Sequence, residues 1–408
     1  MKNPFARSKT LSHGLVWFGA AISVAEIEAG MQCRGQWLAM LLGHAVGGFL
    51  LFATGLIGAR THRSAMETAT AAFGRGGARF FAAANVLQLV GWTAFMVAQG
   101  AGVALPLQSA LGFPALCALL AGLVAAWIFI GRRPATGPGL VALVLLAGLV
   151  VWLSADVVRD ALASASAATE PASFGTVFEV SVAMPLSWLP LISDYTKDAD
   201  RPVASSAVSA GVYTLGSCWM YALGALLAGG DVATSLPEAI RGAGLGMAGL
   251  LVVLFSTVTT TFLDAYSAGE SAHVIDRRAS APVVGVAVCV LGGVLAATGA
   301  LDRYTDFLYL IASVFAPMAA VQLVDAYVVR RTPARAPSVR AAAWNFIAWA
   351  AGFAVYHACL GADSPIQAVI PGAFSFLRGW TSPLGATVSA MVASVLFAIP
   401  ALGRRSAS

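Results

Sequence analysis

The chain has 408 residues, of which 59% are hydrophobic and only 11% are charged. An ordinary soluble domain has about 25% charged residues, and no soluble fold of this length can bury so much apolar surface. These values exclude a soluble protein and indicate an integral membrane protein with the lipid bilayer as its main partner. The net charge of +5 does not indicate nucleic acid, because the basic residues follow the predicted membrane topology.

Twelve apolar segments are long enough to cross a bilayer as α-helices, which need about 20 residues each. In chain order they are 13–30, 36–57, 79–103, 112–131, 138–155, 173–193, 207–229, 244–269, 282–300, 304–329, 340–361 and 383–402. The predicted fold class is therefore all-α, with about twelve transmembrane helices. The stretch 362–382 is apolar but short and broken, which is typical of an interfacial or re-entrant segment.

The basic residues indicate the direction of the helices. If both termini are cytoplasmic, 19 of the 24 Lys and Arg residues fall on the cytoplasmic side, which is the expected positive-inside bias. The five on the outer side are Arg34, Arg159, Arg241, Arg303 and Arg378. We expect a multi-pass protein of the inner (cytoplasmic) membrane, with residues 1–12 and 403–408 in the cytoplasm.

Two carboxylates lie in the middle of the first predicted helix, in FGAAISVAEIEAGM. Charge inside a bilayer is costly, so Glu26 is a candidate site residue. Glu28 lies roughly 200° around the helix from Glu26, so the two can face one cavity only if the helix is broken. Alternatively, Glu28 reaches the outer vestibule.

The third predicted helix carries NVLQLVGWTAFMVAQGAG, in which Gln88 and Trp92 are four residues apart and share a face. An indole offers a flat stacking surface, and an amide offers a donor beside an acceptor. Together they suit a flat heteroaromatic ligand better than an amino acid or a sugar. Trp92 is far from either membrane interface, so anchoring in the interface does not explain it.

The sixth predicted helix, FEVSVAMPLSWLPLISDY, contains Pro185 and Pro190. Because proline removes a backbone donor and clashes with the preceding turn, this helix is predicted to be kinked or unwound. Backbone groups freed at membrane depth need protein, an ion or cavity water as partners. Trp188, beside the break, is a candidate second ring for the substrate, whereas the role of Glu179 near the outer end stays open.

The eighth predicted helix holds the densest polar cluster, FSTVTTTFLDAYSAGES. Ser256, Thr259 and Thr260 share one face and are suitable ligands for a small cation beside the carbonyls of a broken helix. The alternative is that these hydroxyls bond back to their own helix. Asp264 is a candidate to bind substrate or tune the ion site, or else it lies in a cytoplasmic vestibule or pairs with a basic loop residue.

Two segments depart from plain apolar helices: the first, with small residues and two carboxylates in mid-membrane, and the sixth, with its prolines. They lie five helices apart, and paired interruptions at corresponding positions predict an inverted-repeat transporter. The two five-helix repeats are 13–155 and 173–329, followed by two additional helices in 340–402. Neither HExxH, GxSxG nor a zinc-type cysteine spacing is present, so we expect no cofactor and no catalysis. An integral membrane enzyme and a channel are the remote alternatives.

The stretches FGAAISVAEIEAG, NVLQLVGWTAF, FEVSVAMPLSWLPLISDYTKDA and FSTVTTTFLDAYSAGES resemble those of the nucleobase–cation symporter-1 family, and more narrowly its CytX-type hydroxymethylpyrimidine permeases. The likeness covers most of 14–275 and extends through the tenth helix. It implies a LeuT-type fold of five plus five inverted helices, with substrate held between helices 1, 3, 6 and 8.

The resemblance also implies roles for particular residues. Trp92 would stack on the substrate ring, and Glu26 is the polar side chain that follows the helix-1 carbonyls. The implied sodium ligands are the hydroxyls of Ser256, Thr259 and Thr260 and the backbone carbonyls near Ile22 and Ala25. Two positions depart from the family pattern, because Asp264 stands near an expected asparagine and Trp188 follows a proline at an expected aromatic position.

The predicted function is secondary active uptake of a pyrimidine, with hydroxymethylpyrimidine, a thiamin precursor, as the first candidate. Gln88 or a protonated Glu26 could match the donor and acceptor of a 4-aminopyrimidine edge. Cytosine, a purine or another nucleobase is the alternative substrate. The coupling ion is sodium, or a proton on Glu26 or Asp264, and no obligate protein partner is implied.

Overall fold

The computed structural model describes most of the chain, and every described secondary-structure element is helical. The described residues are 9–108, 110–130, 138–163, 172–228, 236–242, 246–299, 304–329, 337–374 and 385–403. The helices are α1 Thr10–Ala21, α2 Val24–Gly30, α3 Trp37–Thr61, α4 Ala65–Ala104, η1 Leu105–Leu107, α5 Phe113–Ile130, α6 Pro138–Ala163, α7 Phe174–Ser187, α8 Leu189–Thr196, α9 Pro202–Ala228, α10 Leu236–Gly242, α11 Gly246–Ile275, α12 Ala281–Ala297, α13 Tyr304–Val324, η2 Asp325–Val329, α14 Val339–Leu360, η3 Gly361–Asp363, α15 Pro365–Val369 and α16 Gly385–Gly403.

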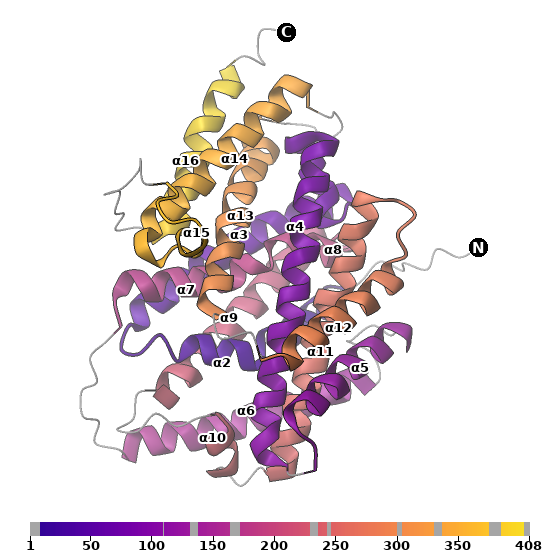
Figure 1. Ribbon diagram of the computed structural model, residues 1–408, viewed down its shortest axis with the longest axis vertical. Coiled ribbons are helices and arrows are strands. Elements are labelled where there is room, and N and C mark those ends of the chain that lie inside the picture. The colour runs from indigo at the N-terminus through magenta and orange to yellow at the C-terminus, as the bar shows by residue number, and fades with distance from the viewer. Residues whose placement is uncertain are drawn as a thin grey trace.

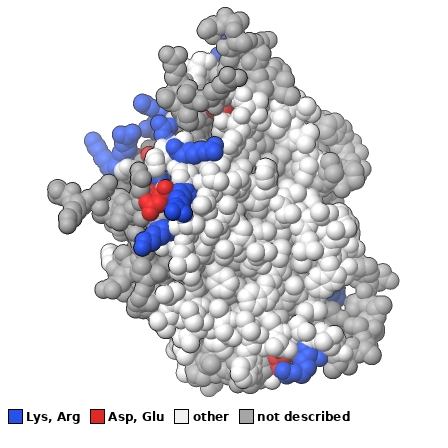
Figure 2. Space-filling view, turned by 180° about the vertical axis from the view of Figure 1, so that it is seen from behind, with Lys and Arg blue, Asp and Glu red and all other residues white. Residues whose placement is uncertain are grey.

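Several helices carry the length and apolar character of membrane spans. Six of the described helices are long and apolar enough to cross a bilayer, or seven if the bent pair α1 and α2 is one span. Each of the twelve predicted segments falls on a helix or on such a pair, but the number of crossings stays a prediction. Figure 2 shows charged side chains gathered toward one end, with a small group at the opposite end and a broad uncharged surface between. Such an uncharged surface suits lipid, and together with the long apolar helices it identifies a multi-pass membrane protein.

The longest helix, α4, runs along much of the molecule and is the support for its neighbours (Figure 1). It begins with a capping box, in which Ser64 and Glu67 satisfy each other's backbone N–H groups. Gly74 has φ 69°, a conformation that favours glycine, and it kinks the helix there. The kink separates the first turns of α4 from the part that contains the third predicted span, 79–103.

The segment after α14 is short and broken, as the sequence predicts. It contains the single turn η3 and the five-residue α15. A hydrogen bond of 2.9 Å joins the Nδ1 of His357 on α14 to the Oγ of Ser364. The same oxygen caps α15 by accepting from a backbone N–H of that helix. The remainder of this segment, 375–384, lies outside the described residues.

The helices α2 and α9 approach each other so closely that backbone touches backbone. A Cβ added to Gly30 would collide with the backbone of Tyr221, and one added to Gly224 would collide with the carbonyl of Ile27. Small residues permit such contact between membrane helices because they bring the backbones within packing distance. This contact fixes how α2 sits on α9.

We expect Gly224→Ala to destabilise the protein by about 1–3 kcal/mol or more, because the new methyl group meets rigid backbone. Thermal unfolding in detergent, followed by tryptophan fluorescence, would measure the loss. The matched control is Gly211→Ala on the same helix, where an added Cβ meets nothing within 4 Å. Equal unfolding temperatures for the two variants would contradict the close contact.

Candidate functional site

The first span is broken between α1 and α2, and the break frees backbone carbonyl groups. The two helices meet at an angle of 56°. Ile22 leaves the helical conformation with φ −86° and ψ 81°, and Ser23 begins α2 by accepting a hydrogen bond of 3.3 Å from the backbone N–H of Glu26. The N–H of Ser23 bonds to Ala21 rather than to Gly19. The carbonyl of Gly19 therefore lacks its usual helical donor.

Hydroxyl groups of α11 face these freed carbonyls. The Oγ of Ser256 donates to the carbonyl of Ile22 at 2.6 Å, and the Oγ1 of Thr260 lies 3.3 Å from the carbonyl of Gly19. Both side chains are buried. The arrangement brings two carbonyl and two hydroxyl oxygens together, which are neutral, hard ligands suited to a small cation.

Three of the five residues predicted as ion ligands, namely Ile22, Ser256 and Thr260, meet in this cluster. Thr259 instead donates to the carbonyl of Phe255 on its own helix at 2.9 Å. Bonding of a hydroxyl back to its own helix is the alternative that the sequence left open. Ala25 lies within α2, beyond the break. The sequence interpretation missed the carbonyl of Gly19, which lies three residues before that of Ile22.

The second interruption, between α7 and α8, is weaker than the sequence predicts. Pro185 lies inside α7 and Pro190 is the second residue of α8, yet Trp188 between them keeps helical angles. The two helices form one continuous span, because a single residue interrupts them. The carbonyl of Pro190 accepts a hydrogen bond of 3.2 Å from the Asn85 side chain of α4. The prolines thus produce a local interruption rather than an unwound segment.

Trp188 lies in an aromatic cluster away from Trp92. Its ring centroid is 5.5 Å from that of Trp17 on α1 and 5.9 Å from that of Tyr213 on α9. Among the described residues, the ring partners of Trp92 are Tyr304 and Phe307 of α13, at 6.0 and 5.4 Å. The structure therefore does not bring the two candidate stacking rings together.

The antiparallel contact of α4 and α11 sets Trp92 and Asp264 at the same level along the two helices. At one end, an added Cβ at Gly100 would lie 2.5 Å from the Oγ1 of Thr257. At the other, Asn85 donates to the Oγ of Ser271 at 2.8 Å. Trp92 and Asp264 both lie about halfway between these two contacts, so they share one depth in the bundle. Asp264 is also seven residues from both Thr257 and Ser271, so it shares their α4-facing side.

Two buried polar atoms flank this position without a hydrogen-bond partner among the described residues. They are the Oε1 of Gln88 and the Oδ2 of Asp264. Both side chains are at most 5% exposed, and the Nε2 of Gln88 is held by Asn85 at 2.6 Å. Buried polar groups normally have partners. An indole, an amide oxygen and a carboxyl oxygen thus lie at about one depth in the bundle, and the two oxygens lack partners among the described residues.

The other membrane carboxylates have protein partners. Glu26 accepts hydrogen bonds from Tyr213 and Ser217, both of α9. Glu28 accepts one of 2.5 Å from Gln99 of α4. Glu179 on α7 accepts from the backbone and side chain of Thr387, at the first turn of α16. Glu26 therefore faces α9, and Glu179 joins α7 to the C-terminal helices.

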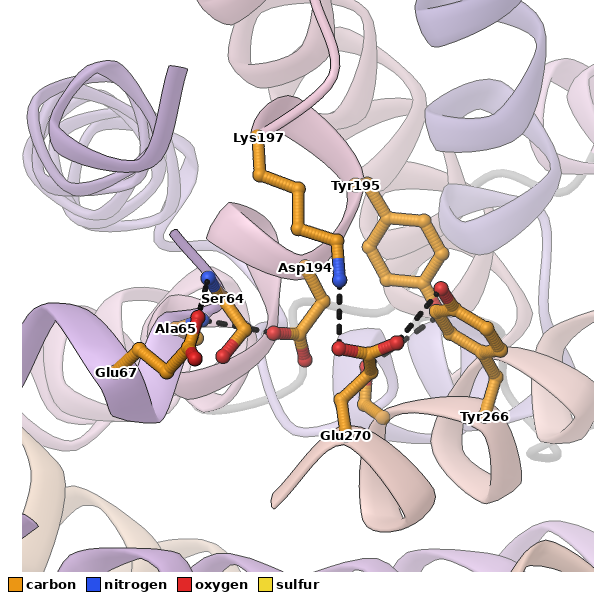
Figure 3. A network of polar contacts seen from close by, with 9 residues as sticks. Ser64, Ala65, Glu67, Asp194, Tyr195, Lys197, Tyr266 and Glu270 are labelled. Atoms are coloured by element: carbon orange, nitrogen blue, oxygen red, sulfur yellow. Dashed lines mark hydrogen bonds and ion pairs between the residues drawn. The ribbon is translucent and has the colours of Figure 1, made fainter. Parts of the chain in front are cut away.

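A polar network joins α4, α8 and α11 at the end of the bundle that the charge distribution predicts to be cytoplasmic (Figure 3). The Nζ of Lys197 lies 2.6 Å from the Oε2 of Glu270, which joins the end of α8 to α11. Asp194 caps α4 by accepting a hydrogen bond of 2.7 Å from the backbone N–H of Ala65. Tyr195 donates to the carbonyl of Leu263 at 2.8 Å. Three separate contacts thus hold α8 against α4 and α11.

Lys197 keeps its charge in this network. Burial lowers the pKa of Lys197, but Asp194 and Glu270 raise it more, so the pKa lies above its usual value. We expect Lys197→Gln to open this end and to shift the inward- and outward-facing populations by about tenfold, the effect of roughly 1.4 kcal/mol. A cysteine introduced on the predicted cytoplasmic side of Asp264 would be labelled faster as the inward-facing population rises. The exchange Lys197→Glu with Glu270→Lys should restore closure, and failure to do so would contradict an ion-pair lock.

Comparison with known proteins shows which fold this is. No protein-family model matches the chain, and no curated protein matches it. Among solved structures, the inward-facing conformation of Mhp1 has a TM-score of 0.73 at 19% identity, covering 98% of this chain and 91% of that one. This chain has the Mhp1 fold. A closed form of Mhp1, a nucleobase-cation-symport-1 family transporter with bromovinylhydantoin bound, has a TM-score of 0.72 at 19% identity over 98% and 95% of the two chains.

A third similar structure is a Na⁺-coupled sialic acid symporter, with a TM-score of 0.66 at 14% identity over 97% of this chain and 90% of that one. The predicted all-helical, LeuT-type fold is confirmed by these matches, which extend over nearly the whole chain. The boundaries of the two repeats and of the C-terminal helices stay predictions. At these identities the likeness establishes the fold alone.

Proposed function

We propose that the chain is a secondary active transporter that couples entry of a sodium ion to uptake of a flat pyrimidine. The observation that carries the proposal is the meeting of the Gly19 and Ile22 carbonyls with the hydroxyls of Ser256 and Thr260. The ligands come from a broken helix and from a straight one, so a bound cation would join α1 to α11. The similarity to a symporter described as Na⁺-coupled supports this choice of ion.

Hydroxymethylpyrimidine is the substrate that we propose to bind at Trp92. Its aromatic ring can stack on the indole, which contributes about 1–3 kcal/mol for a nucleic-acid base. Its amino group is a donor that the Oε1 of Gln88 or the Oδ2 of Asp264 would accept, and both atoms lack partners among the described residues. A protonated Asp264 would in addition donate to a ring nitrogen. Glu26 and Trp188 stand apart from this group of residues.

Alternating access would then depend on contacts at the two ends of the bundle. At the predicted outer end, Glu28 of α2 is bonded to Gln99 of α4. At the predicted cytoplasmic end, Lys197 is paired with Glu270 of α11. Breaking one contact while keeping the other opens the central residues to one side only. Sodium bound between α1 and α11 would favour the arrangement in which the two helices are close.

Uptake of tritiated hydroxymethylpyrimidine into proteoliposomes tests the proposal. We expect accumulation with an inward sodium gradient and none when choline replaces sodium on both sides. Competition by unlabelled cytosine and thiamin would show which part of the molecule is recognised. Stronger competition by cytosine than by hydroxymethylpyrimidine would favour the nucleobase alternative. Sodium-independent, non-saturable entry would contradict a symporter.

A further inference from the structure

A completely buried carboxylate lies in the middle of the bundle without a basic partner. Glu26 is 1% exposed, and the Oη of Tyr213 and the Oγ of Ser217 each lie 2.6 Å from one of its oxygens. No described Lys or Arg forms an ion pair with it. An ionised carboxylate at this depth is costly unless charge or a proton compensates it.

The hydrogen-bonded chain continues from Glu26 through Ser217 to a buried histidine. The Nε2 of His44 lies 2.8 Å from the Oγ of Ser217, and its Nδ1 lies 2.9 Å from the carbonyl of Met40. His44 has no exposed surface. One continuous line of hydrogen bonds thus joins α3, α9 and α2.

Counting hydrogens along this line shows how many protons it holds. The carbonyl of Met40 can only accept, so the Nδ1 of His44 must carry a hydrogen. If His44 is neutral, its Nε2 then accepts the single hydrogen of the Ser217 hydroxyl. The hydroxyl oxygen must in turn accept from Glu26, which requires a protonated carboxyl group.

The same number of protons permits a second satisfied arrangement. If the proton of Glu26 moves to His44, both imidazole nitrogens donate and the serine hydroxyl turns to donate to an ionised Glu26. Removing the proton leaves two acceptors, on Glu26 and His44, competing for one serine hydrogen. Adding a second proton directs two donors at the serine oxygen, which can accept both, but leaves the serine hydrogen without an acceptor in the line. Every hydrogen bond in the line is therefore satisfied when it holds one proton.

Among the described residues, few other groups near Glu26 could take this proton. The remaining titratable side chains near Glu26 are Cys218 and Tyr221 of α9, Tyr304 of α13 and Glu28 on its own helix. The first three are normally neutral, and Glu28 is bonded to Gln99. Among the described residues, α4, α7 and α11 add no titratable neighbour.

The proton site is separate from the sodium ligands and adjoins the second helix interruption. Sodium would bind the carbonyls of Gly19 and Ile22, which precede the break, whereas Glu26 follows it. Tyr213, which donates to Glu26, contacts the ring of Trp188 at 5.9 Å. Movement of the α7–α8 junction can therefore displace Tyr213 through its contact with Trp188 and so change the hydrogen bond to the carboxylate.

We propose that Glu26, Ser217 and His44 bind one exchangeable proton, so that the transporter carries a proton in addition to sodium. The proposal rests on the proposed function for its role in transport, but proton binding itself requires no substrate. Exchange with water would occur when α2 and α9 move relative to α3.

Infrared spectroscopy of the reconstituted full-length protein tests the proton site directly, without a substrate. We expect a protonated-carboxyl band in the wild type that shifts in D₂O and is lost as the pH is raised. Glu26→Gln should lack this band, because its amide reproduces the hydrogen bonds of the protonated acid. Glu28→Gln, two residues away on the same helix, is the matched control and should keep it.

Identical bands in the wild type and Glu26→Gln would overturn the proposal, and so would a band that neither shifts in D₂O nor titrates. Ser217→Ala provides a second variant that keeps the carboxylate but removes its link to His44. Its band should move to higher frequency because the acid loses its acceptor, and an unchanged band would also overturn the proposal. Absence of hydroxymethylpyrimidine uptake would bear on the substrate assignment alone.

Discussion

Thr260→Ala is expected to raise the sodium concentration that gives half-maximal uptake by about ten- to a hundredfold. The substitution removes one of four oxygens that would bind the ion, and a hydrogen bond or ligand to a charged group contributes about 1.5–3 kcal/mol. Among the described residues, the hydroxyl of Thr260 makes its hydrogen bond to the carbonyl of Gly19. Uptake measured against sodium concentration would show the change as a raised half-saturation concentration.

The neighbouring Thr259 supplies the control for this result. Its hydroxyl bonds within α11 and is half-buried, so Thr259→Ala should leave the sodium response within about twofold of the wild type. A large sodium effect at Thr259 with none at Thr260 would mean that the side of α11 facing the ion has been misassigned. Substitution to serine at position 260 should retain sodium coupling.

Trp92→Ala is expected to raise the KM for the pyrimidine by about ten- to a hundredfold, because it removes the stacking surface. Trp92→Phe keeps an aromatic face and should recover most of the affinity. Radiolabelled uptake at several substrate concentrations would separate the KM from the maximal rate. A fall in the maximal rate alone would place the indole in the moving contacts with Tyr304 and Phe307.

Trp152→Ala provides the comparison for loss of an indole elsewhere. Trp152 lies on α6 with 62% of its surface exposed, on the side of the helix suited to lipid. Its removal should leave the KM unchanged. An equal loss of affinity in both variants would point to general damage to the bundle rather than to ring recognition.

The sequence is sufficient to locate most of the helices and to single out their polar positions. The apolar segments coincide with helices because length and hydrophobicity alone decide which segments can lie in lipid. The hydroxyl cluster of α11 was visible as a periodic pattern, and Ser256 and Thr260 do face the broken helix. These features depend on local spacing, which the chain carries in its order of residues.

Side-chain direction near the breaks was harder to predict. The sequence predicts Glu26 beside the substrate, but after the turn at Ser23 its side chain faces α9. The carbonyl of Gly19 has no signature in the sequence, because it is free only when the N–H of Ser23 bonds elsewhere. The link between His44 and Glu26 has no signal in the sequence, because the two are joined through Ser217 of a third helix. Such contacts depend on tertiary packing.

The backbone contact of Gly30 and Gly224 has a consequence for following the transport cycle by spectroscopy. Because no side chain fits between α2 and α9 there, a probe attached to the exposed side of α9 will report the position of α2 as well. Pairs of spin labels on α9 and α11 would therefore measure the opening of the outer half of the broken span. Labels placed on α2 and α9 would give a constant distance and serve as an internal ruler.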